Sequence, residues 1–154
     1  MLLSELYVQL GEDRLRELLR HVSLGKLKTF QMFDRLKTRC HLSKLNQENL
    51  RNASPKLLAR IQEGDDVLAA ELAQCVLVSH MDLIIAVLDK QGVAHTDGFF
   101  DKEADVASKL TSGWQQACYD AFADKFPKSV LVFYLNHLAI ETNPEATVFL
   151  PAGA

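Results

Sequence analysis

The sequence lacks most of the short motifs that identify a known chemistry. It has no glycine-rich phosphate loop, no Gly-x-Ser-x-Gly motif, and no cysteine or histidine set at zinc-ligand spacing. Its three cysteines, Cys40, Cys75 and Cys118, are odd in number and widely spaced, with no Cys-x-x-Cys pair. This cysteine usage predicts reduced thiols in a cytoplasmic protein. From the sequence we assign no catalytic residue, no metal ligand and no cofactor.

A long uninterrupted apolar run is also missing. The most apolar stretch, residues 67–88, is interrupted by Glu71, His80 and Asp82, and a charge at the centre of a bilayer is costly. The start, MLLSELYVQL, has no basic region before an apolar run, as a secretory signal would have. We therefore expect no membrane partner. With 48% hydrophobic and 24% charged residues, the composition is typical of one soluble globular domain over residues 1–154.

Apolar residues recur at helical spacing along nearly the whole chain. This periodicity predicts an all-α, single-domain bundle of six or seven helices around a long central helix at about 65–90. Glycines at the ends of the periodic stretches predict helix ends, with Gly64 before the central helix and Gly92 after it. Residues 129–141 contain β-favouring residues, but a lone strand would have no partner, so we predict a helix there.

The other segments follow from the same periodicity. One helix is expected before Gly11 and another after it, and a third around Leu27–Leu36. A polar connection is expected from about Ser43 to Ser54. A loop over residues 92–101 contains the turn-forming pair Asp97-Gly98, and Asp101 can cap a helix that runs to about Phe122. Residues 143–154 are predicted to form an extended tail.

Charge is distributed unevenly along the chain. Residues 1–60 hold 12 basic and 6 acidic residues, so this part has a net charge of +6. Residues 61–154 hold 5 basic and 14 acidic residues, which gives −9. Two such parts attract each other, either within one domain or between two copies. An acidic stripe on the central helix is formed by Glu71, Asp82 and Asp89. Apolar Val67, Val78 and Ile85 lie beside this acidic stripe and form a candidate interface, so we expect a homodimer.

Two further sets of residues suggest binding sites. His80, at the centre of the apolar face, forms a candidate ligand pocket with His137, Glu71 or Asp82, although a core histidine is the commoner role. If the acidic stripe is buried, its carboxylates need cations, for which we consider Arg14, Arg20 and Arg60.

Lys28, Arg35 and Arg39 form a candidate basic face on the third helix, as a nucleic-acid-binding helix would have. No helix-turn-helix signature precedes that face, so nucleic acid is a possible partner that we do not favour. The sequence thus predicts a non-catalytic cytoplasmic helical binding or interaction protein that self-associates. The alternatives are a nucleic-acid-binding regulator and a ligand- or metal-binding pocket protein centred on His80.

Overall fold

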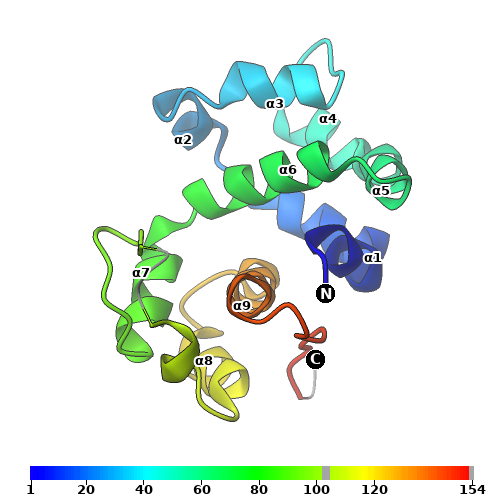
Figure 1. Ribbon diagram of the computed structural model, residues 1–154. Helices are drawn as coiled ribbons and strands as arrows, with labels where there is room; N and C mark the ends of the chain where they lie inside the picture. The colour runs from blue at the N-terminus through cyan, green and yellow to red at the C-terminus, as the bar shows by residue number, and fades with distance from the viewer. Residues whose placement is uncertain (102–104, 153–154) are drawn as a thin grey trace. The chain divides into compact units, whose positions relative to one another are not determined.

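A computed structural model describes residues 1–101 and 105–152 of the chain. This part forms nine α-helices and a 3₁₀ helix, with no strand, which confirms the predicted all-α class (Figure 1). The helices are α1 (Leu3–Arg20), α2 (Leu24–Thr29), α3 (Phe33–Arg39), α4 (Gln47–Asn52), α5 (Ser54–Gln62), α6 (Asp66–Val78), α7 (Met81–Lys90), the 3₁₀ helix η1 (Ala107–Lys109), α8 (Trp114–Phe122) and α9 (Lys128–Thr142).

The chain forms two compact units, which meet in the sequence between Ser79 and His80. In the first unit, α1 packs against α4, α5 and α6, while α2 and α3 also contact α6. Leucines dominate its core, and the Tyr7 hydroxyl donates a hydrogen bond to the Ala69 carbonyl at 3.1 Å, which links α1 to α6. Gly11 has φ 84° and interrupts α1 between the two helices predicted from the sequence. Only glycine adopts this backbone conformation at little cost.

The second unit contains α7, η1, α8 and α9, with α8 packed on α9. Residues 129–141 are helical, as predicted, within α9. The buried Asn136 amide anchors the following segment: its Oδ1 accepts from the Phe149 backbone N–H at 2.6 Å, and its Nδ2 donates to the Phe149 carbonyl at 3.0 Å. The segment from Asn143 to residue 152 has no helix, and residues 153–154 of the predicted tail lie outside the described residues.

The predicted central helix at 65–90 is wrong, because the structure has two helices, α6 and α7, in its place. Ser79 Oγ donates to the Cys75 carbonyl at 2.7 Å and accepts from the Ser23 backbone N–H at 2.9 Å. Lys26 Nζ also donates to the Ser79 carbonyl at 3.3 Å. These bonds occupy the backbone carbonyls of Cys75 and Ser79 and the Ser79 hydroxyl. The next residue, His80, leaves helical geometry, with φ −137° and ψ 48°. Among the described helices none alone has both the length and the apolar character to cross a membrane; α6 and α7 reach that threshold only when counted together across their break.

The predicted third helix is also wrong, because it is divided into α2 and α3. Gln31 has φ 58°, its N–H donates to the Lys28 carbonyl, and the Met32 N–H donates to the Leu27 carbonyl at 2.7 Å. This pair of bonds is a Schellman motif, which ends a helix. Glycine usually occupies the left-handed position, so glutamine gives no signal in the sequence.

Two other segments differ from the prediction. The expected polar connection at residues 43–54 contains α4, which begins where Asn46 Oδ1 accepts from the Asn49 N–H at 2.8 Å. The helix expected from Asp101 to about Phe122 begins only at Trp114, because Gly113 has a left-handed φ of 78°. Residues 102–104 of that expected helix lie outside the described residues.

Candidate functional site

The acidic stripe predicted on one helix is distributed over α6 and α7. Glu71, on α6, has a side chain only 15% exposed and pairs with Arg35 Nε at 3.1 Å. Arg14, Arg20 and Arg60 were the cations considered for a buried acidic stripe, and this choice is wrong for Glu71, whose cation is Arg35. Arg60 instead pairs with Asp65 at 2.7 Å and donates to the Arg39 carbonyl at 2.8 Å. Asp82, on α7, is exposed.

Residues of the predicted basic face lie on two helices. Lys28 is on α2, and its ammonium lies 4.9 Å from the centroid of the Phe33 ring. Arg35 and Arg39 are on α3, where Arg35 is paired with Glu71. Because Gln31 separates the two helices, the three cations do not form one face of one helix.

The three residues of the candidate interface differ in exposure. Val67, in the first turn of α6, is 53% exposed. Val78, at the end of α6, and Ile85, on α7, are both half-buried. The helix break at Ser79–His80 separates Val67 and Val78 from Ile85, so the prediction of one interface along one helix loses its geometric basis.

His80 and His137, the two histidines considered for a ligand pocket, lie in different parts of the second unit. His80 is half-buried and immediately precedes α7. His137 lies on α9, and its Nδ1 is 3.3 Å from Glu141 Oε1. Burial lowers the pKa of His137 to about 4 and raises the pKa of Glu141. The imidazole of His137 is therefore neutral at pH 7, and its contact with Glu141 is not an ion pair.

The region around His137 holds another polar group without a partner. Tyr134 lies one turn before His137 on α9, and burial raises the pKa of its hydroxyl well above the ordinary value. Neither the Tyr134 hydroxyl nor His137 Nδ1 makes a hydrogen bond within the described part of the chain. No group of three or more His, Cys, Asp or Glu residues that could hold a metal ion is found among residues 1–101 and 105–152.

The cysteines are not activated for nucleophilic chemistry. All three are buried and unpaired. Burial raises the pKa of Cys40 and of Cys118 to about 11, and that of Cys75 to about 12. The thiolate is the nucleophilic form, so these thiols are inert at neutral pH.

The loop at residues 92–101 contains a short turn from Thr96 to Phe99, and His95 next to this turn contacts Asp89 of α7. The Thr96 and Phe99 backbones exchange two hydrogen bonds around Asp97 and Gly98, which have φ 51° and 93°. His95 Nδ1 accepts from the Gly98 N–H at 3.0 Å, and its Nε2 lies 2.7 Å from Asp89 Oδ1. His95 and Asp97 therefore have structural roles in this turn.

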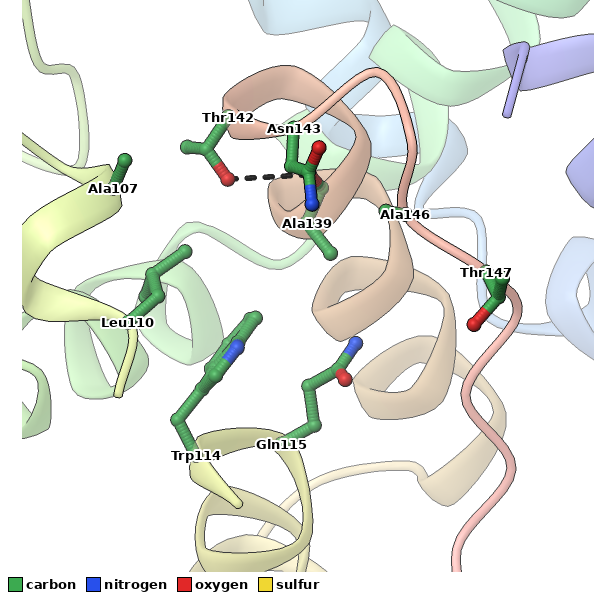
Figure 2. A pocket seen from close by; sticks show the side chains of 9 residues that line it. All are labelled: Ala107, Leu110, Trp114, Gln115, Ala139, Thr142, Asn143, Ala146 and Thr147. Carbon is green, nitrogen blue, oxygen red and sulfur yellow. Dashed lines mark hydrogen bonds between the residues drawn. The ribbon is translucent and has the colours of Figure 1, made fainter. Parts of the chain in front are cut away.

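The second unit also contains a pocket of about 420 Å³ that the sequence did not indicate. Figure 2 shows it between the beginning of α8, the end of α9 and the segment that follows α9. Ligand pockets in proteins have volumes in this range. The described lining residues are Ala107, Leu110, Trp114, Gln115, Ala139, Thr142, Asn143, Ala146 and Thr147.

Three polar side chains of the pocket, those of Gln115, Thr142 and Asn143, are oriented by bonds to the backbone. Gln115 Nε2 donates to the Leu135 carbonyl at 3.2 Å. Thr142 Oγ1 donates to the Leu138 and Ala139 carbonyls, the latter bond drawn as a dashed line in Figure 2. Asn143 Oδ1 accepts from the Glu145 N–H at 3.0 Å. These bonds leave Gln115 Oε1 and Asn143 Nδ2 without a partner among the described residues.

Nothing in the sequence marked these residues, because they come from four separate segments and belong to no motif. The only local signals are Gly113 before Trp114-Gln115 and Thr142-Asn143 at the end of an apolar helix. No protein-family model, no curated protein and no solved structure matches the chain.

Proposed function

We propose that the protein is a non-catalytic helical binding protein and that its ligand site is the pocket between α8 and α9. The observation that carries the proposal is the lining of that pocket: a volume of about 420 Å³ bounded by Leu110, Trp114 and three alanines, with a few polar groups held in place. Small-molecule sites place oriented polar groups among apolar and aromatic side chains; here five of the nine described lining residues are apolar or aromatic and four are polar.

The chemistry of the lining supports binding in preference to catalysis. None of its nine described residues has a side chain that titrates near neutral pH. Proton transfer and nucleophilic attack need such groups within reach of the ligand. The ligand would therefore be held by shape, by the Trp114 ring and by the side-chain amides of Gln115 and Asn143.

The chain's single tryptophan provides the test, since Trp114 lines the pocket. A library of small fragments would be titrated while Trp114 fluorescence is followed with excitation at a wavelength that tyrosine does not absorb. We expect saturable changes with some fragments, and loss of those changes in Ala139→Leu, which fills the pocket. Ala117→Leu is the matched control, because Ala117 is exposed on α8 and outside the lining. Equal responses in the two variants would contradict the proposal.

Self-association is a second part of the proposal. The exposed Val67 on α6 is a large apolar side chain in contact with water, and two-fold dimers bury such residues twice. We also propose a reducing, cytoplasmic setting, which the three unpaired thiols support. The nucleic-acid alternative is less well supported, because Arg35 is already paired with Glu71.

A further inference from the structure

The hydrogen-bonding groups of the pocket are fixed in direction and differ in kind. Asn143 Oδ1 accepts from the Glu145 N–H, so both N–H donors of its Nδ2 are left to a ligand. One N–H of Gln115 Nε2 donates to the Leu135 carbonyl, so the acceptor Oε1 and the second N–H are left to a ligand. In Figure 2 both side chains extend toward the pocket that they line. The pocket thus offers amide donors on Asn143 and an amide acceptor on Gln115.

The helix ends around the pocket carry partial charges of opposite sign. Trp114 and Gln115 are the first two residues of α8, whose N-cap Gly113 has no capping side chain. Thr142 is the last residue of α9, and Asn143 follows it. A helix beginning has partial positive charge and a helix end has partial negative charge. A dipolar neutral group is stabilised by both ends, whereas an ion of either sign is repelled by one of them.

The remaining walls favour a flat ligand. The Trp114 side chain stands in the pocket between Leu110 and Gln115 (Figure 2). Its indole N–H has no acceptor within the described part of the chain, so it is a further donor. Indole rings stack on flat π systems, and alanines leave space for one.

We propose that the pocket binds a neutral, planar small molecule bearing a carboxamide. The ligand's carbonyl accepts from Asn143 Nδ2 or the indole N–H, its N–H donates to Gln115 Oε1, and its ring lies against Trp114. This inference rests on the proposed function, since it names the ligand class of the same pocket.

The test uses three probes of nearly equal shape. Benzamide has the carbonyl and the N–H donors, acetophenone has the carbonyl alone, and benzoate is an anion. Titrated against Trp114 fluorescence in the full-length protein, benzamide should bind at least about tenfold more tightly than either of the others, the difference that one lost hydrogen bond gives. Asn143→Asp keeps the acceptor for Glu145 and removes the donor, so it should weaken benzamide binding by about tenfold or more. Ala117→Asp, which adds the same charge on the exposed side of α8, should leave benzamide binding unchanged.

The outcomes separate this inference from the function on which it rests. Binding of benzoate or acetophenone as tight as that of benzamide overturns the inference, as does an unaltered benzamide affinity in Asn143→Asp. If benzamide fails while other fragments bind and Ala139→Leu abolishes their binding, the ligand class is wrong and the binding function stands. If no fragment responds to Ala139→Leu, both are wrong.

Discussion

Lowering the pH from 7 to 5 is expected to destabilise the second unit through His137. An unfolded histidine has a pKa of about 6.5, whereas burial on α9 lowers the pKa of His137 to about 4. Between these values the unfolded chain binds a proton that the folded chain excludes, so stability is fully present above pH 6.5 and falls as the pH is lowered toward 4. Linkage with these two values gives a loss of about 2 kcal/mol at pH 5 and about 3 kcal/mol at pH 4.

The assay compares the wild type with His137→Gln in urea titrations at pH 7, 6 and 5. Trp114 belongs to the same unit as His137, so its fluorescence reports the unfolding of that unit. Every other titrating group is common to the two proteins, including Glu141, whose raised pKa acts in the opposite direction. The difference in unfolding free energy between them should therefore shift in favour of the variant by about 2 kcal/mol on going from pH 7 to 5. If the difference in unfolding free energy between the two proteins does not change with pH, His137 is not a buried neutral imidazole.

Three further predictions concern the turn, the C-terminal segment and self-association. Gly98→Ala and Gly92→Ala should each cost about 1 kcal/mol in urea unfolding, because both glycines have positive φ. A Cβ at Gly98 would also lie 2.7 Å from Met81 Cε, but this atom ends a flexible side chain that can shift; a much larger cost at Gly98 than at Gly92 would show that Met81 cannot move. Asn136→Ala should lower the free energy of unfolding by about 2 kcal/mol and speed proteolytic cleavage near Phe149, because it removes the two bonds between the Asn136 amide and the Phe149 backbone. An unchanged cleavage rate would show that Asn136 does not anchor the segment after α9. Light scattering at micromolar concentration should show a dimer that Val67→Glu weakens more than Lys28→Glu does, and a monomer at high concentration would overturn self-association.

The ends of the helices show how far the sequence could predict the fold. Gly64 and Gly92 occupy the left-handed positions after α5 and α7, and the sequence predicted helix ends at both. Gln31 and His41 occupy the same position after α2 and α3, with the same pair of backbone bonds. Glycine adopts positive φ without a steric cost and therefore marks a helix end in the sequence, whereas glutamine and histidine rarely adopt it and so gave no such mark.

Contacts between residues far apart in the sequence explain why the candidate site could not be predicted from the sequence. At the helix break, Ser79 Oγ accepts from the backbone N–H of Ser23, a residue 56 positions earlier, and no local sequence pattern contains that bond. The sequence led us to consider Arg14, Arg20 and Arg60 for a buried acidic stripe, whereas Glu71 pairs with Arg35, because α3 lies against α6. The pocket was missed for the same reason: its walls come together only when the start of α8 and the end of α9 are packed.

The position of α1 has a consequence for synthesis on the ribosome. Its inward-facing residues, Leu6, Tyr7, Leu10, Leu15, Leu18 and Leu19, are covered in the folded unit, and α1 packs chiefly on α5. That partner ends about 40 residues further along the chain, which at typical translation rates is a delay of roughly 2 to 8 s. During this interval the nascent helix exposes an amphipathic surface without its partner. A chaperone that binds apolar segments has this interval in which to bind α1, and a ribosome stalled short of α5 would leave α1 uncovered.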